Sequence, residues 1–456
     1  MRANNRIQTS LAPALVVVGT VVVNIMAAIA IASSLAGSGA HASDQIPGAA
    51  PDAPIALVGG SVYPVDRDPI GVATVLIVDG KVTAIGKDID VPDRATRVDV
   101  SGRRIYPGLI ACGTQLGLVE IGAVRATRDE SEVGVLNPNV RAEVSVNPDS
   151  ELIPVSRANG IALALSHPQG GTISGRSALL RLDGWTYEEL TYRAPVGLHV
   201  NWPNMHVDVP GNEKRSKERR ETRDQAIDAL RSIFRDAAAY REAAPGGPID
   251  LRLEALVPCL ERKTAVFFHA NEERQIRGAL DFAAEFELRA VLVGGRDAAL
   301  VTDRLAGGSV PVIFGPVHAL PGGRDADYDA VFTTPSKLYD AGVPFAIAGF
   351  WTSNTRNLPY HAATAAAYGL PPEIALRAIT LSPAEILGVA ERVGSITVGK
   401  DATLIITDGD PLEITTQVVG MYIDGRPVDL SSRHTLLYDK YRKRLEEEKS
   451  KKRRSF

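Results

Sequence analysis

The sequence predicts an α/β fold: a TIM-like (β/α)8 barrel joined to a small composite β-sandwich that both chain ends build. Two observations support this prediction. Short strand-like runs with turn signals lie near the two ends of the sequence, whereas the long middle alternates strand-like and helix-like segments. Such alternation is typical of a parallel sheet with crossover helices. A doubly wound open sheet is the runner-up, but no glycine-rich nucleotide fingerprint favours it.

The β-rich ends carry hairpin signals. Alternating apolar residues flank Asp79-Gly80 in ATVLIVDGKVTAIGK, and Asp424-Gly425 interrupts VVGMYIDGRPVDL. Asp-Gly between such runs is a strong two-residue turn. We therefore predict one composite β-sandwich formed by residues 55–106 and 394–430.

The middle of the chain, residues 107–393, is predicted to form the barrel. TAVFFHA, RAVLVGG, SVPVIFG and VPFAIAGF are short apolar runs, with helix-like stretches such as NEERQIRGALDFAAEF between them. Repeated βα units over roughly 280 residues suit a (β/α)8 barrel. The charged stretch 211–244 is predicted to be helical, solvated in its first half and amphipathic in its second.

The N-terminal residues 1–42 are predicted to be a signal peptide or a membrane anchor. Arg2 and Arg6 precede an almost uncharged apolar run, and the small-x-small triplet Ala40-His41-Ala42 ends it. The run is also long enough to span a bilayer, so cleavage and anchoring both stay open. Either way we expect export, to the periplasm or to the outer face of the cytoplasmic membrane. A linker is expected over 43–54 and a charged, solvated tail over 431–456.

The composition bears on which classes of partner the protein could bind. The 456 residues carry a net charge of −4, which does not favour nucleic acid. A membrane is expected to be contacted only through the N-terminal segment, and no oligomeric state is indicated. Two cysteines, Cys112 and Cys259, make no disulfide framework and no CxxC metal site, and Cys112 lies in an apolar run that predicts burial.

The motifs RRIYPGLI and LRAITLSPAEILGVAERVGSITVGKDATLIITDGDPL resemble the amidohydrolase superfamily, in its imidazolonepropionase-like and dipeptidase-like branch. The resemblance extends over residues 55–428. It implies metal-assisted hydrolysis of carbon–nitrogen bonds, with ligands at the carboxyl ends of barrel strands. It also implies where those ligands stand: a His-x-His pair on strand one, a lysine or glutamate on strand four, histidines on strands five and six, and an aspartate on strand eight.

Most of the positions that the resemblance assigns to metal ligands hold other residues. PGLIACGTQLG has Gly113 and Gln115 where the His-x-His pair is expected. AVLVGG has no histidine at the strand-six position, and FAIAGFWTSN has Gly349 and Phe350 in place of the aspartate. Only His269, in VFFHAN, matches.

The metal candidates are therefore His269 and, after the next strand-like run, His318. With His167 of GIALALSHPQGG they would form a rebuilt zinc site; otherwise the sequence indicates no cofactor. The remaining histidines, which show no ligand spacing, are interpreted as structural: His199, His206, His361 and His434.

Polar side chains at the expected barrel mouth predict a site for a small polar or peptide-like molecule. The predicted ligand-binding residues are Thr114, Gln115, His269, Asn271, Trp351, Asn354 and Arg356.

Two functional hypotheses follow. The first is a hydrolase of non-peptide or dipeptide-like carbon–nitrogen bonds with an altered metal site. The alternative is a catalytically inactive, metal-free relative that serves as an exported ligand- or partner-binding protein. The resemblance favours the first and the substituted positions favour the second, so no catalytic residue is assigned.

Overall fold

The computed structural model describes residues 45–242, 248–323 and 326–454. The signal or anchor prediction for residues 1–42 lies outside the described residues. Among the helices in the described ranges, none combines the length and the apolar character needed to cross a membrane.

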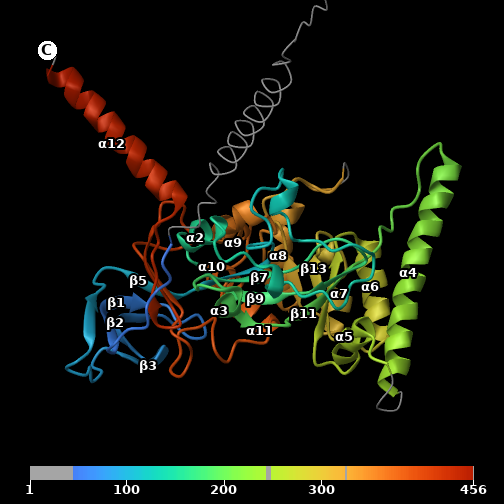
Figure 1. Cartoon of the computed structure of the whole chain (residues 1–456), viewed down its shortest axis with the longest axis horizontal. Helices are drawn as coiled ribbons and strands as arrows, with labels where there is room; N and C mark the ends of the chain where they lie inside the picture. Colours follow the sequence, from blue (N-terminus) through green and yellow to red (C-terminus); the bar gives the residue numbers. More distant parts are fainter. Residues whose placement is uncertain (1–44, 243–247, 324–325, 455–456) are drawn as a thin grey trace, which may run out of the picture. The chain divides into compact units, whose positions relative to one another are not determined.

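The described residues form a TIM-barrel-like α/β fold (Figure 1). Its central strands are short apolar runs that are buried almost throughout, as parallel strands covered on both faces must be. β6 and β7 are parallel neighbours, and β11 to β15 form a parallel run. These strands are β6 (Leu109–Thr114), β7 (Ile161–Ser166), β11 (Gly197–Asn201), β12 (Ala265–Ala270), β13 (Ala290–Gly294), β14 (Val312–Phe314) and β15 (Phe345–Ile347).

The segment between β7 and β11 departs from the predicted repetition of βα units. β8 (Ile173–Arg176) pairs antiparallel with β11, and β9 (Ala178–Arg181) pairs antiparallel with β7. Only residues 167–172 connect β7 to β8. A parallel connection needs about a dozen residues or more, so this short connection forces the chain to run back antiparallel. β10 (Thr191–Arg193) then continues the edge beside β9.

β15 and β6 do not pair with each other, but both form hydrogen bonds with the backbone of residues 378–379. The Ile347 N–H donates to the Ala378 carbonyl, and the Ile110 N–H donates to the Ile379 carbonyl, each at 2.9 Å. Residues 378–379 therefore supply hydrogen-bond partners to one residue of each strand.

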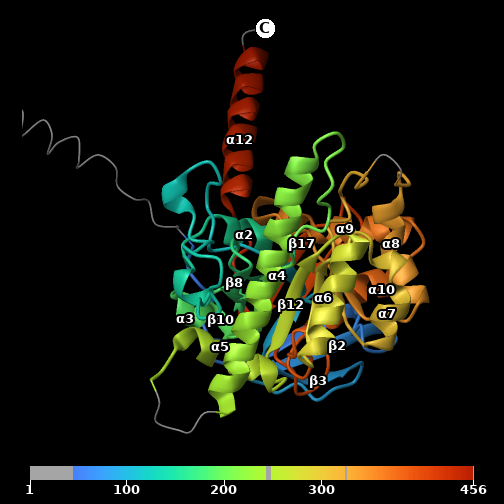
Figure 2. The same ribbon diagram turned by 90° about the vertical axis from the view of Figure 1, so that its right-hand side faces the viewer.

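Helices cover the outside of the parallel strands, and Figure 2 shows α4 and α6 in front of β12. In α4, Leu230, Ile233 and Phe234 are buried while most of the charged first half is exposed, as the sequence predicts. The rings of Phe234 and Phe282 pack α4 against α6 at 5.3 Å. The helices are α2 (Leu152–Arg157), α3 (Tyr187–Leu190), α4 (Glu213–Glu242), α5 (Leu251–Leu260), α6 (Glu273–Glu285), α7 (Thr302–Gly307), α8 (Ala330–Asp340), α9 (Leu358–Ala367), α10 (Pro372–Arg377), α11 (Leu381–Ile386) and α12 (Arg433–Arg454).

A second sheet combines strands from both ends of the described chain. β16 pairs antiparallel with β5, with Leu404 opposite Pro107. In Figure 1 the blue N-terminal strands and red C-terminal segments accordingly lie side by side. The sheet has its own apolar core, to which Leu57, Val75 and Leu404 contribute. Its strands are β1 (Ile55–Val62), β2 (Ile70–Val78), β3 (Lys81–Gly86), β4 (Thr96–Asp99), β5 (Arg104–Pro107), β16 (Leu404–Thr407), β17 (Val418–Ile423) and β18 (Arg426–Pro427).

Asp401, just before β16, links this sheet to the barrel strands. Its Oδ1 accepts a hydrogen bond from Lys81 at 2.8 Å, and its Oδ2 accepts from Tyr192 and Arg392, both at 2.7 Å. The Arg392 guanidinium also lies over the Tyr192 ring, 4.4 Å from its centroid. Burial raises the pKa of Asp401, but the hydrogen bonds from Lys81 and Tyr192 and the charge of Arg392 outweigh it and hold the pKa below its usual value.

The segments predicted as linker and tail differ in character. Within 43–54, Gly48 is tied to the protein because its N–H donates to the Asp183 carboxylate at 2.9 Å. The tail contains α12, whose described side chains are exposed. Cys112 and Cys259 are both free and buried.

Candidate active site at the ends of β7, β11 and β12

Three histidines form a cluster near the carboxyl ends of β7, β11 and β12. His167 directly follows β7, and His199 and His269 lie in β11 and β12. Each offers one ring nitrogen, and these atoms all lie within 4.8 Å of one another. The rings of His167 and His199 are stacked 4.6 Å apart, and the His269 ring is tilted 5.1 Å from both. Within the described chain this is the group of side chains best placed to share a metal ion.

The strand pairing explains why these residues meet. β11 and β12 are parallel neighbours, so their carboxyl ends lie at the same edge of the sheet. Phe267 stands opposite His199 in the register, and its ring stacks on the outer face of the His199 ring at 4.9 Å. His199 is thus held between Phe267 and His167.

Hydrogen bonds fix the tautomer of His167. Its Nδ1 lies 3.1 Å from the Pro168 carbonyl oxygen, which can only accept, so Nδ1 carries the proton. The lone pair is then on Nε2, which accepts from the Gln115 amide at 3.2 Å. Gln115 in turn accepts at its Oε1 from the Thr352 hydroxyl at 3.3 Å. A backbone carbonyl that holds the far nitrogen is the arrangement usual for metal-ligating histidines.

His199 and His269 bond to each other. The His199 Nδ1 lies 2.8 Å from the His269 Nε2. The Nε2 of His199 is buried and has no hydrogen-bond partner among the described residues. A buried polar atom without a partner is rare in folded proteins and needs an explanation.

All three imidazoles are held in the neutral form. Burial lowers the pKa of His167 to about 4, although the Pro168 carbonyl opposes the shift. Burial lowers the pKa of His199 far below its usual value, helped by His167 and His269, and burial and His167 do the same for His269. Neutral imidazole is the form that binds metals.

The donor set fits a divalent metal in number, protonation state and spacing. Three neutral histidines with an open fourth position are a known catalytic arrangement for zinc. Two nitrogens bound to one tetrahedral zinc, each at about 2.0–2.1 Å, are about 3.3 Å apart. The pair at 2.8 Å and the 4.8 Å limit for the group bracket this value. The hydrogen bond between His199 and His269 and the bond from Gln115 to the His167 Nε2 use ring nitrogens that a metal would need.

At Gly113, one of the two strand-one positions where the resemblance expects a histidine, the ring of Phe350 fills the side-chain space. Gly113 has φ +78°, and a Cβ built on it would lie 2.6 Å from the Phe350 ring and 3.9 Å from the His167 Nε2. The Phe350 ring therefore occupies the space into which a side chain at position 113 would project. Phe350 itself has φ +60°, which is uncommon outside glycine.

The strand-six position shows the same arrangement. Gly294 has φ +95°, and a Cβ there would lie 2.5 Å from the Asn271 Oδ1. A histidine at position 294 could not coexist with Asn271 as it now stands. Gly113 and Gly294 thus stand at positions where the resemblance expects ligands, and neighbouring side chains occupy the space beside them.

A cavity of about 200 Å³ opens beside the cluster. Among the described residues that line it there is no carboxylate, so its polar groups are amides and imidazoles. The lining residues are Gln115, His167, Gln169, His269, Asn271, Val293, Gly294, Gly315, Pro316 and Phe350.

The predicted ligand-binding residues divide between this cavity and its surroundings. Gln115, His269 and Asn271 line it. Thr114 is buried next to it and shares a hydrogen bond with Thr355 at 3.0 Å.

Three predicted residues are not among those that line the cavity. The Trp351 side chain is 63% exposed, and Asn354 lies in the 3-10 helix η4 (Thr352–Asn357) that follows it. Arg356 points to α12, where its guanidinium lies 2.6 Å from the His434 Nδ1. The sequence shows that these residues follow β15 but not which of them line the cavity.

The grouping of His318 with His167 and His269 is not observed, and His199 takes that place. After β14 the chain runs toward α9. There the His318 ring stacks on His361 at 4.1 Å, and its Nε2 lies 2.8 Å from the Thr364 hydroxyl.

Sequence reasoning missed His199, Gln169 and Phe350. GLHVN contains a histidine after an apolar pair, as VFFHA does, and this shared pattern was the available signal for His199. The resemblance implies a lysine or glutamate, not a histidine, on that strand, so it did not favour His199 as a ligand. No signal in the sequence placed Gln169 or the Phe350 ring in the cavity.

Comparisons with known proteins agree with this architecture. A model described as the amidohydrolase family matches residues 349–430. The chain is 27% identical over 406 residues to the amidohydrolase tasK of Hapsidospora irregularis, which covers 79% of this chain and 41% of that protein. It is 29% identical over 150 residues to the N-substituted formamide deformylase of Arthrobacter pascens, covering 29% of this chain and 28% of that protein. The chain thus spans less than half the length of these two relatives.

A solved structure is similar over almost its whole length. The amidohydrolase from Thermotoga maritima superposes with a TM-score of 0.75 at 28% identity, covering 82% of this chain and 99% of that one. The TIM-barrel-like fold described above is therefore shared with a protein of comparable extent.

Proposed function

Because the chain belongs to the amidohydrolase superfamily, we propose that it hydrolyses carbon–nitrogen bonds at the cluster of His167, His199 and His269. The observation that carries this proposal is the convergence of three neutral imidazoles, two buried and that of His269 half-buried, near the carboxyl ends of β7, β11 and β12. In TIM-barrel enzymes this end of the barrel carries the active site.

The three histidines would hold one divalent metal, for which zinc suits the nitrogen ligands. When bound, such a metal supplies Lewis acidity, which lowers the pKa of a water molecule toward neutrality and polarises a carbonyl group. The Pro168 carbonyl keeps the His167 lone pair on Nε2, as a ligand requires.

The other residues of the cavity act on the substrate. The amides of Gln115, Gln169 and Asn271 can donate to and accept from a planar C–N group, which supports an amide, formamide or dipeptide-like substrate. The Phe350 ring excludes water from one corner of the cavity, which strengthens the electrostatic interactions there. No carboxylate stands among the described lining residues, so the cavity offers amide groups to the substrate and no acidic side chain.

A metal analysis of the purified chain tests the proposal. We expect about one zinc, manganese or iron per chain, lost in His199→Ala and retained in the matched variant His434→Ala, whose histidine is exposed on α12. We also expect release of amine from N-formyl amines or dipeptides, abolished by chelation and restored by metal. Metal-free wild-type protein, or metal retained in His199→Ala, would contradict the proposed site.

The alternative function is that of a metal-free protein that binds a ligand or a partner. The hydrogen bond between His199 and His269 supports it, since that bond satisfies two ring nitrogens without a metal. Under this alternative, chelation leaves both the fold and ligand binding unchanged, and no amide in the panel is hydrolysed.

We also propose that the central strands close into a barrel and that the two chain ends form one composite domain. The bridging hydrogen bonds of residues 378–379 and the pairing of β16 with β5 support these proposals. Export stays a proposal that rests on the composition of residues 1–42. Fractionation of cells that make the full chain, with mass analysis of its N-terminus, would separate cleavage from anchoring.

A further inference from the structure

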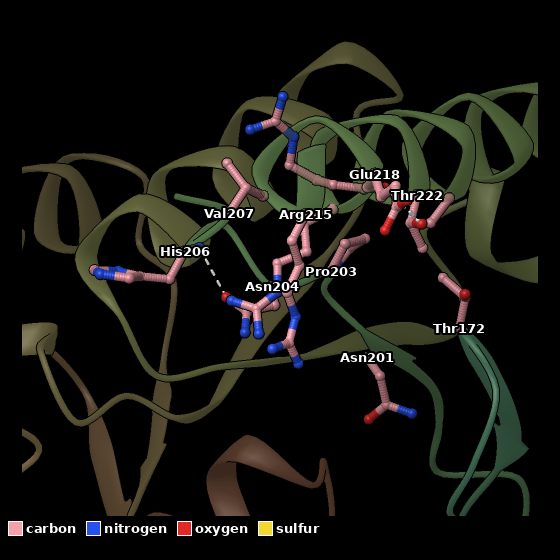
Figure 3. Close-up of a pocket in the computed structure, with 12 residues that line it drawn as sticks. Thr172, Asn201, Pro203, Asn204, His206, Val207, Arg215, Glu218 and Thr222 are labelled. Carbon is pink, nitrogen blue, oxygen red and sulfur yellow. Dashed lines mark hydrogen bonds between the residues drawn. The ribbon is translucent and has the colours of Figure 1, made fainter. Parts of the chain in front are cut away.

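A second pocket, larger than the cavity beside the histidines, lies between the loop after β11 and one face of α4 (Figure 3). Its volume is about 510 Å³, within the range of small-molecule sites. The residues that line it are Thr172, Asn201, Pro203, Asn204, His206, Val207, Arg215, Glu218, Arg219, Thr222, Arg223 and Ala226.

One helix face makes this pocket strongly basic. Arg215, Arg219 and Arg223 are spaced four residues apart in α4, so their side chains project from the same side of the helix. Glu218 is the single acidic residue among the described residues that line the pocket. The lining therefore carries an excess of positive charge.

Two of these arginines have unused hydrogen-bonding capacity. Arg223 bonds to Asp224 at 2.8 Å, and the neighbouring Arg220, outside the pocket, bonds to Asp208 at 2.8 Å. Across the described part of the chain, the guanidinium groups of Arg215 and Arg219 have no hydrogen-bond or ion-pair partner. A guanidinium presents a rigid fork of donors that matches a carboxylate or a phosphate.

The rest of the lining suits a small molecule. The amides of Asn201 and Asn204 and the hydroxyls of Thr172 and Thr222 offer neutral hydrogen-bonding groups. Pro203, Val207 and Ala226 add apolar surface. A few polar groups around apolar walls are typical of sites that orient one organic ligand.

The pocket also reaches the strand that carries the histidine cluster. Asn201 ends β11 two residues after His199, so both side chains lie on the same face of that strand. In the strand register Asn201 stands opposite His269. Asn201 of the pocket lining therefore lies next to the histidine cluster.

We infer that this pocket binds a small organic anion, whose carboxylate or phosphate group is held by Arg215 and Arg219. This binding goes beyond the proposed hydrolysis and does not require it, because none of the three clustered histidines lines the pocket.

Calorimetric titration of the metal-free chain at constant ionic strength tests the inference. Succinate and phosphoglycerate serve as probes for the carboxylate and phosphate chemistries, and inorganic phosphate tests whether the anion alone suffices. The double variant Arg215→Gln/Arg219→Gln removes both free guanidinium groups. Lys214→Gln/Lys217→Gln is the matched control. These substitutions remove two positive charges from the same turns of α4, but both lysines are exposed and neither lines the pocket.

We expect saturable binding of one organic probe, weakened by about tenfold or more in the arginine variant and by less than about twofold in the control. The preferred probe identifies the anion as carboxylate or phosphate. Equal weakening in both variants, which would indicate only long-range attraction, overturns the inference, and so does the absence of binding by the wild-type chain.

A third variant separates shape from charge. Thr222 is exposed on α4 and lines the pocket, so Thr222→Trp fills the space without altering any charge or buried contact. Loss of binding in this variant supports the pocket as the site. Unchanged affinity would place the anion elsewhere and contradict the inference, whether or not the chain hydrolyses amides.

Discussion

The Phe350 ring lies in the space that a side chain at position 113 would occupy. A Cβ at position 113 would lie 2.6 Å from that ring. The same holds for Gly294 and Asn271. At both positions a neighbouring side chain fills the space in front of the glycine.

The steric coupling of Gly113 to Phe350 can be measured. Gly113→Ala should lower the free energy of unfolding by about 2–4 kcal/mol, because it adds a clash to an unfavourable left-handed backbone. In a Phe350→Ala background the clash is gone, and the same change should cost only about 1–2 kcal/mol. Urea denaturation of the four proteins gives the coupling energy.

Gly122→Ala is the control for this cycle, because a Cβ at Gly122 meets nothing within 4 Å. It should change the free energy of unfolding by no more than about 0.5 kcal/mol. If Gly113→Ala costs the same with and without the Phe350 ring, the two residues do not compete for space.

At the scale of elements, the sequence predicts the strands and their order well but not every direction. Alternating and apolar runs around Asp79-Gly80 and in VFFHA correspond to β2, β3 and β12, since these patterns depend on local backbone geometry. The antiparallel course of β8 and β9 is set by the short connection 167–172, which the βα pattern conceals. The interpretation of His199 as structural is wrong for a related reason, because only the pairing of β11 with β12 brings it to His269.

His167, after β7, and His361, in α9, are buried histidines. Protonating either of them would oppose folding. Burial lowers the pKa of His361 to about 3, with His318 adding to the shift, and that of His167 to about 4. The ordinary histidine pKa is near 6.5, so between pH 6.5 and these values the unfolded chain binds more protons than the folded one. The stability of the metal-free chain should therefore fall as pH falls through this window.

The expected slope is about 1.4 kcal/mol per pH unit for each histidine that stays neutral in the fold. Denaturation of chelated protein between pH 6.5 and 5 measures it. His361→Gln should reduce the slope by about that amount. An unchanged slope in this variant would show that His361 is protonated in the folded protein.

For the whole molecule, Asp401 is a buried residue that joins the sheet built from both chain ends to β10. It accepts hydrogen bonds from β3, from β10 and from Arg392, and it is almost fully buried. The sequence predicts that both chain ends build one sheet. It does not predict this junction, because the partners of Asp401 lie far apart in the chain.

Asp401→Asn should lower the free energy of unfolding by about 2–4 kcal/mol, since it removes a charge that three donors share. Thermal and urea denaturation should show the loss in both sheets as one transition. Asp93→Asn, at an exposed position, should change the free energy of unfolding by no more than about 0.5 kcal/mol. Equal losses in the two variants would mean that the junction does not couple the sheets.

The pairing of β16 with β5 also constrains how the chain matures during synthesis. Pro107 leaves the ribosome long before Leu404, its partner in the register. Until then β5 has an unpaired edge, and exposed edges are templates for aggregation. Contacts between residues so distant in sequence also form slowly. The nascent protein therefore passes through a long interval in which the sheet of β5 and β16 is incomplete, and chaperone binding would matter most during that interval.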